Sequence, residues 1–151
     1  CLPEAVPFDQ AKGVSFRRDG AAGILSVRAS FDDGASEYEH QLVCGEQVKD
    51  GKTIALPVRR IVCLSSTHIG YLGELDALDR LVGVSKRVHV ANKQVLGRID
   101  RGEIAQVGDG SPIDNEKLLA CQPDLVVTFG VSEKDVEPFE AVRRAGIPVL
   151  V

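Results

Sequence analysis

The stretch Arg60-Ile61-Val62-Cys63-Leu64-Ser65-Ser66-Thr67 decides the fold class. Residues 61–64 form a short uninterrupted apolar run, which is typical of a strand covered on both faces in a parallel sheet. The three hydroxyl residues that follow all favour a helix N-cap position. The stretch therefore predicts a strand that leads directly into a helix. In open α/β sheets, ligands bind at that junction.

The same alternation continues to the end of the chain. Further strands are predicted at residues 81–85, 125–129 and 147–151, with a very short one at 106–108. Helices are expected at 68–78, around 94–100, at 115–121 capped by Asp114, and from Ser132 to a glycine C-cap at Gly146. In the first helix Ile69, Leu72, Leu75 and Leu78 recur along one face. This order predicts a right-handed parallel, Rossmann-like sheet with helices on both faces.

Residues 13–57 have a different pattern. Short β-prone runs are separated by Asp-Gly turns, as in Asp32-Asp33-Gly34 and Asp50-Gly51-Lys52. Such turns between alternating segments indicate hairpins, so we expect a small antiparallel β-meander that ends at residues 53–56. The predicted domains are a tether at 1–12, the meander at 13–57 and an α/β lobe at 58–151.

Composition places the chain among ordinary globular proteins. It has 151 residues, 44% of them hydrophobic, and a net charge of −4. Lysine and arginine form no block, so neither nucleic acid nor an anionic membrane surface is an expected partner. No apolar run is long enough to span a membrane. Any membrane attachment is therefore expected to be an anchor.

The first residue, Cys1, suggests such an anchor. Cys1 and the Pro- and Glu-containing residues after it resemble the mature start of a bacterial lipoprotein, whose cysteine is acylated, although an arbitrary chain boundary is the alternative. Cys44, Cys63 and Cys121 show no metal-ligand spacing. Cys63 and Cys121 are expected to be buried free thiols. A disulfide involving Cys44 stays open.

Five ordered blocks carry a family resemblance: 60–67, 78–85, Val107-Gly108, 114–127 and 145–149. Together they resemble the N-terminal lobe of the class III, or helical-backbone, substrate-binding proteins of ABC importers for iron-siderophores, haem and cobalamin. The resemblance covers residues 58–151. The preceding meander lies outside the common pattern, although lipoproteins of gut-type Bacteroidetes resemble this arrangement.

The resemblance implies a binding function without catalysis and without a cofactor, in the periplasm or at the cell surface. Two lobes joined by a long helix would hold the ligand between loops at the carboxyl ends of the strands, and a full-length form would continue past Val151 into the second lobe. Glu116 matches the glutamate that docks on arginines of the membrane permease. The ligand-binding residues implied in this lobe are Ser66, Thr67, His68, Lys86, Arg87, His89, Asp109, Gly110, Phe129 and Gly130.

The residue types in these loops bear on the ligand. Thr67-His68 stands where many relatives have Thr-Glu, and Phe129 is the only expected stacking ring, which weakens the case for a broad corrin. Lys86 and Arg87 would suit an anionic ferric chelate or haem propionates, unless they are solvated loop charges. His68 and His89 are candidate iron or haem ligands, against the commoner role of a surface or capping histidine.

Two other classes of function stay open. A small Rossmann-like enzyme could use Ser66 with His68, but the sequence lacks the glycines of Gly-x-Ser-x-Gly and of Gly-x-Gly-x-x-Gly. A structural or adhesive surface lipoprotein would bind through the meander at residues 13–57.

Overall fold

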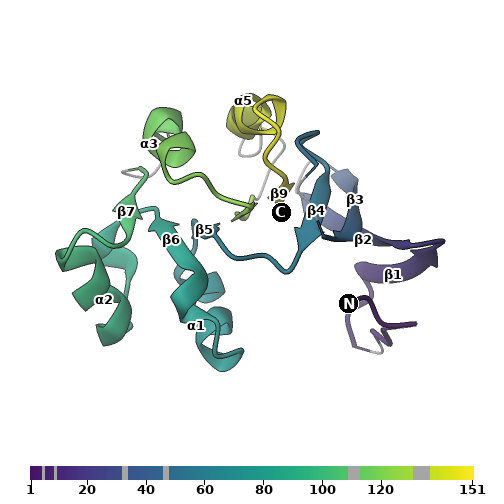
Figure 1. Ribbon diagram of the computed structural model, residues 1–151, viewed down its shortest axis with the longest axis horizontal. Helices are drawn as coiled ribbons and strands as arrows, with labels where there is room; N and C mark the ends of the chain where they lie inside the picture. Colours follow the sequence, from purple (N-terminus) through teal and green to yellow (C-terminus); the bar gives the residue numbers. More distant parts are fainter. Residues whose placement is uncertain (5, 9, 32–33, 46–47, 109–112, 131–136) are drawn as a thin grey trace. The chain divides into compact units, whose positions relative to one another are not determined.

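The computed structural model describes residues 1–4, 6–8, 10–31, 34–45, 48–108, 113–130 and 137–151 (Figure 1). These residues form two compact units. The first joins Cys1–Val58 with Gly130–Val151, and the second is Arg59–Phe129. Each unit is described by itself.

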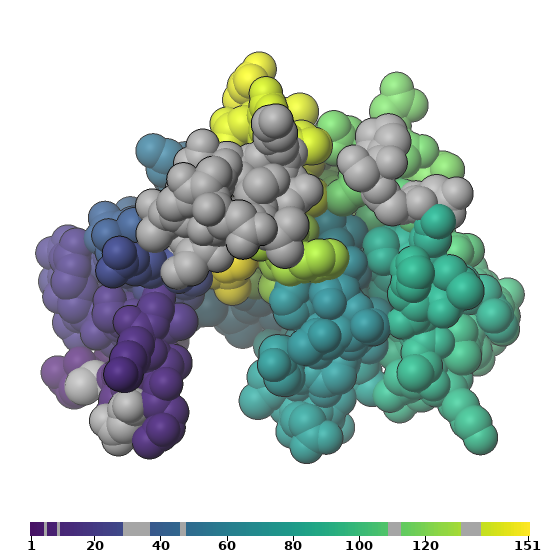
Figure 2. Space-filling model, turned by 180° about the vertical axis from the view of Figure 1, so that it is seen from behind, coloured from purple at the N-terminus to yellow at the C-terminus, as the bar shows by residue number. Residues whose placement is uncertain are grey.

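The unit Arg59–Phe129 is built on parallel strands. It contains β5 (Ile61–Cys63), α1 (Ser66–Glu74), β6 (Leu81–Val84), α2 (Lys93–Asp100), β7 (Ala105–Gln106), α3 (Asn115–Ala120) and β8 (Leu125–Val127), with short 3-10 turns η1 (Leu78–Arg80) and η2 (Arg87–His89). Its strands follow the order β7-β6-β5-β8, and each neighbouring pair is parallel. Figure 1 shows α1 and α2 on one side of these strands and α3 on the other, and Figure 2 shows the same unit in teal and green from behind.

Local sequence signals explain these elements. All three residues of β5 are buried, as the apolar run predicted. Ser65 is the N-cap of α1, where its side chain accepts a hydrogen bond from the Thr67 N–H at 3.2 Å. Asp114 caps α3 in the same way through the Lys117 N–H at 3.0 Å. The predicted α/β alternation is therefore confirmed in this unit.

The apolar face predicted for α1 is wrong at its last turn. Ile69 is buried with 5% of its surface exposed, but Leu75 is 74% exposed. The helix ends at Glu74 and Leu75 is its C-cap, so the helical spacing that would bring Leu75 back to the core no longer applies.

The other unit begins with a small sheet in the order β1-β2-β3-β4. Strands β1 (Val14–Asp19), β2 (Ala22–Phe31) and β3 (Gly34–Cys44) pair antiparallel, which confirms the predicted meander for three strands. The fourth strand, β4 (Thr53–Leu56), pairs parallel with β3, so the hairpin predicted at residues 50–52 is wrong. The Asp50 carboxylate accepts hydrogen bonds from the Lys52 N–H, the Thr53 N–H and the Thr53 hydroxyl. These hydrogen bonds fix the turn just before β4, but they do not determine in which direction β4 runs relative to β3.

The end of the chain belongs to the same unit as this sheet. It contributes η3 (Glu137–Phe139), α5 (Glu140–Arg144) and β9 (Val149–Leu150), which falls within the predicted last strand. Gly146 follows the C-cap of α5 with φ +85°, as expected for a glycine that ends a helix. The predicted helix start at Ser132 and Asp135 lies outside the described residues.

Two glycines allow α5 to pack against the turn before β4. A Cβ atom on Gly51 would collide with the Arg143 carbonyl, and one on Gly146 would lie 2.7 Å from the Cβ of Lys49. Nearby, the Arg143 guanidinium lies 5.7 Å from the centre of the Tyr38 ring. The meander and α5 therefore share one packed interface.

Replacing Gly51 by alanine should break this interface. Gly51→Ala meets the backbone of α5 and also has φ +73°, whereas Gly20→Ala is a matched control with φ +58° and no heavy atom within 4 Å. We expect Gly51→Ala to lower the free energy of unfolding by about 2 kcal/mol more than Gly20→Ala does. Urea unfolding followed by circular dichroism measures the free energy of unfolding of both variants. Equal losses of stability would contradict the close contact between Gly51 and α5.

Candidate functional site

The carboxyl ends of β5, β6 and β8 lie at one edge of the parallel strands, because these strands pair in one direction. The Leu64 N–H donates to the Val127 carbonyl at 3.0 Å, which joins the ends of β5 and β8. The residues that follow the three strands are therefore neighbours along one rim. This rim, formed by residues 65–68, 85–89 and 128–129, is the candidate ligand site.

The first part of the rim is the start of α1. Ser66 and Thr67 are exposed, and His68 is half-buried. His68 Nδ1 is buried and has no hydrogen-bond partner in the described part of the chain. Burial lowers the pKa of the His68 imidazole, and the backbone of Val127 opposes this shift. His68 therefore presents a neutral ring with one nitrogen unused.

The second part of the rim follows β6. The Arg87 guanidinium donates to both oxygens of the Asp100 carboxylate, at 2.8 and 2.9 Å, and the Arg87 N–H donates to Gln106 Oε1 at 2.9 Å. Hydrogen bonding within this pair raises the pKa of Arg87 and lowers that of Asp100. The arginine predicted to meet an anionic ligand thus already has a bidentate carboxylate partner.

In the rest of the second part of the rim, Ser85 and Lys86 are half-buried and the residues after Arg87 are open to solvent. Val88 is 78% exposed, and His89 beside it is also exposed. After β8, Phe129 is 60% exposed, whereas the preceding Thr128 is buried. Of the remaining predicted ligand residues, Gly130 belongs to the other compact unit, and Asp109 and Gly110 lie outside the described residues. The rim therefore offers two apolar side chains in addition to its histidines.

Glu116, the residue predicted to dock on a permease, is accessible to solvent. It is exposed in the first turn of α3, and no salt bridge involves it among the described residues. Its neighbour Lys117 pairs instead with the N-cap Asp114, at 3.1 Å. The Glu116 carboxylate can therefore reach a partner outside this unit.

No metal centre is evident in the part of the chain that the structure describes, where no three His, Cys, Asp or Glu side chains gather closely enough to hold an ion. Iron ligation by His68 and His89 stays a prediction. Cys63 and Cys121 are buried free thiols, as expected, and burial raises the pKa of Cys63 to about 12. None of the described helices has the length and apolar character needed to span a membrane.

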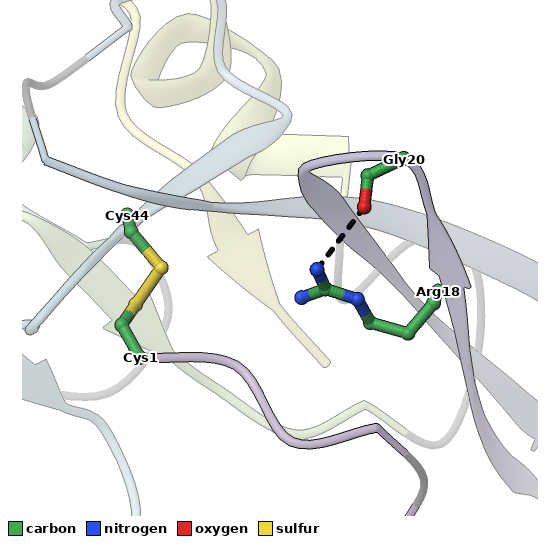
Figure 3. The surroundings of a disulfide bond; sticks show 4 residues. All are labelled: Cys1, Arg18, Gly20 and Cys44. Carbon is green, nitrogen blue, oxygen red and sulfur yellow. Dashed lines mark hydrogen bonds between the residues drawn. A yellow bond between two sulfur atoms is a disulfide. The ribbon is translucent and has the colours of Figure 1, made fainter.

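The predicted lipid anchor, Cys1, forms a disulfide with Cys44 (Figure 3). The two Cα atoms are 6.1 Å apart, and 43 positions separate the residues in the sequence. An acylated cysteine carries its lipid on the same sulfur atom. The disulfide and the lipid anchor are therefore alternative states of Cys1, and the open question about Cys44 is answered here by this pairing.

Neither a protein-family model nor a curated protein matches the chain. Solved structures do, and binding proteins are among them. The petrobactin-binding protein YclQ from Bacillus subtilis aligns with a TM-score of 0.50 at 14% identity, over 83% of this chain and 36% of that one. The periplasmic vitamin B12-binding protein BtuF of Vibrio cholerae aligns with a TM-score of 0.42 at 22% identity, over 62% and 33%.

The likeness to the petrobactin-binding protein shows that this chain has the fold of part of that protein. The chain spans about a third of the length of the structures that it matches. What those proteins bind bears on this chain only as a basis for proposals.

Several features of the site were missed from the sequence. Asp100 was not expected to contact Arg87, because the two are thirteen positions apart and charged residues are common in both segments. Val88 gives no signal in the sequence, because one apolar residue between charged ones has no periodicity. Only the folded chain shows that η2 turns this side chain outward.

The buried state of His68 has a consequence for stability. Because its pKa is lowered on folding, the unfolded chain takes up a proton near pH 6.5 and the folded chain only at lower pH, so stability should fall as the pH drops below about 6.5. We expect His68→Gln to reduce the stability lost between pH 7.5 and 5.0. Urea unfolding at both values measures this, with the exposed His89→Gln as control. If the two variants lose stability as the wild type does, His68 is not buried as described.

Proposed function

We propose that this chain is part of the substrate-binding component of an ABC importer. The complete protein would capture an iron complex, a ferric siderophore or haem, or alternatively cobalamin, and deliver it to a membrane permease. The observation that carries the proposal is the rim itself. Exposed side chains from three separate loops follow the carboxyl ends of neighbouring parallel strands in a fold like that of a binding protein.

The chemistry of the rim suits capture without reaction. Phe129 and Val88 offer apolar surface to a ligand. No hydrogen bond links Ser66 to His68 in the described part of the chain, so the enzyme alternative gains no support from this pair. A ligand anion would have to compete with Asp100 for Arg87.

Location follows from the same proposal. A binding component works outside the cytoplasmic membrane, in the periplasm or at the cell surface, where disulfides persist. The Cys1–Cys44 bond is compatible with that compartment. If Cys1 is instead acylated in the cell, it would tether the same unit to the membrane.

Ligand titration tests the binding step. Ferric siderophores of the catecholate and hydroxamate types, haem and cobalamin would be titrated against the complete protein by calorimetry. We expect one class to bind, and we expect Phe129→Ala to weaken it about tenfold by removing an exposed ring from the rim. Tyr71→Ala is the control, because Tyr71 is 62% exposed on α1 and lies outside the rim. Absence of binding by every ligand would rule out the importer function.

Transport tests the docking step separately. We expect Glu116→Arg to reduce ligand uptake in cells by at least about tenfold, because it places a positive charge against arginines of the permease. Ligand affinity of the purified variant should stay unchanged. Glu74→Arg, at another exposed position at the end of α1, is the matched control. Uptake that responds equally to both changes would argue against a specific docking role for Glu116.

A further inference from the structure

Among the residues that the structure describes, no strand lies beside the first part of the outer edge of β3. Strand β4 pairs only with Gln41–Cys44. The Gly45 N–H donates to the Leu56 carbonyl at 3.1 Å, so Gly45 points toward β4. Alternate residues of a strand direct their backbone groups to the same side, which places the N–H and C=O of Glu37 and Glu39 on the side of β4, before β4 begins. These groups form an open sheet edge.

A groove runs along this open edge. Its volume is about 790 Å³, and it is lined by residues 37–41 of β3, the turn at residues 50–53, Glu140, Arg143 and Arg144 of α5, and Ile24 of β2. The Arg143 guanidinium is held by Glu140 at 2.7 Å and lies over the Tyr38 ring. The turn is held by the Asp50 carboxylate. The walls of the groove are therefore fixed by internal contacts.

His40 adds an unused polar atom to the lining. It is only 4% exposed, and its Nδ1 lies 3.3 Å from the Lys52 carbonyl. Its Nε2 is buried and has no hydrogen-bond partner among the described residues. Burial lowers the pKa of the His40 imidazole, and the charge of Arg143 lowers it further, so the ring is neutral near pH 7.

We propose that this open edge binds an extended peptide segment of another protein, which adds to the sheet as a strand beside β3. Unpaired backbone groups on a sheet edge are a template for strand addition, and side-chain pairs supply the specificity. At about 3.3 Å per residue, the open stretch accommodates a segment of roughly four or five residues.

The charges on β3 and in the groove predict the sequence of that segment. Glu37 and Glu39 are exposed and, being two positions apart, project on the same face of β3. Residues opposite them in an added strand would be lysine or arginine. Glu39 also approaches Arg17, at 3.5 Å, but both side chains are more than half exposed, so that pair is weak. The groove's basic residues Lys52 and Arg144 disfavour an unbroken basic run, so basic residues should alternate with uncharged ones.

A labelled synthetic peptide with alternating lysines, acetyl-Lys-Thr-Lys-Val-Lys-Thr-amide, tests this site in the complete protein. Fluorescence anisotropy should show saturable binding, and Glu37→Lys with Glu39→Lys should weaken it at least about tenfold. The control carries the same change in net charge at two exposed acids elsewhere in the unit, Glu4→Lys with Asp19→Lys. Methylating alternate peptide nitrogens, either those of the lysines or those of the Thr and Val residues, should weaken binding in one of the two series and not in the other, because alternate N–H groups of an added strand point toward β3.

Three results would overturn the proposal. One is no binding of the peptide. A second is equal weakening by the two double variants, which would indicate attraction to overall charge. The third is protection of the Glu37 and Glu39 amides from hydrogen exchange in the complete protein without peptide, which would show that its own chain already covers the edge. Circular dichroism verifies that each variant is folded.

Discussion

The burial of β5 between β6 and β8 is the constraint on which the candidate site depends. Val62, at the middle of β5, has no exposed surface. The strand is held at both ends. The Asp124 carboxylate accepts from the Arg59 and Arg60 N–H groups, and the Arg60 guanidinium donates to the Cys121 and Gln122 carbonyls. At the other end the Leu64 N–H meets Val127. A strand fixed in this way sets where the loops after it begin, so the rim is built on a rigid support.

Much of this unit could be predicted because its signals are local. An apolar run of four residues specifies a buried strand, and a hydroxyl or carboxylate before a helix satisfies backbone N–H groups that otherwise lack partners. Ser65 and Asp114 do so as expected. Signals of this kind fail where an element ends early, as at Leu75, or where pairing is decided at a distance. The parallel approach of β4 to β3 is such a case, since an Asp-Gly turn favours a bend without fixing which strand follows it.

The site was less predictable than the fold for the same reason. Which residues follow each strand can be read from the sequence, and these residues do line one rim. The state of each side chain depends on partners far along the chain. Arg87 was expected to offer its charge to a ligand, but Asp100 on α2 already holds it in a bidentate pair. The pair is exposed on both sides, so solvent screens it and an incoming anion has a modest interaction to displace. The apolar surface of Phe129 and Val88 has no such competitor.

The packing of the meander also bears on what it does. If the meander were only a loosely attached module, it would make few contacts with α5. Instead, the turn before β4 packs closely against α5, because Gly51 and Gly146 have no side chains to keep them apart. Arg143 serves two contacts at once, with Glu140 and with the Tyr38 ring. These contacts fix α5 beside β3 at the stretch that β4 leaves unpaired. The same packing that makes the meander an integral part of its unit thus creates a walled groove beside an open strand edge, which a loosely attached module would not hold in place.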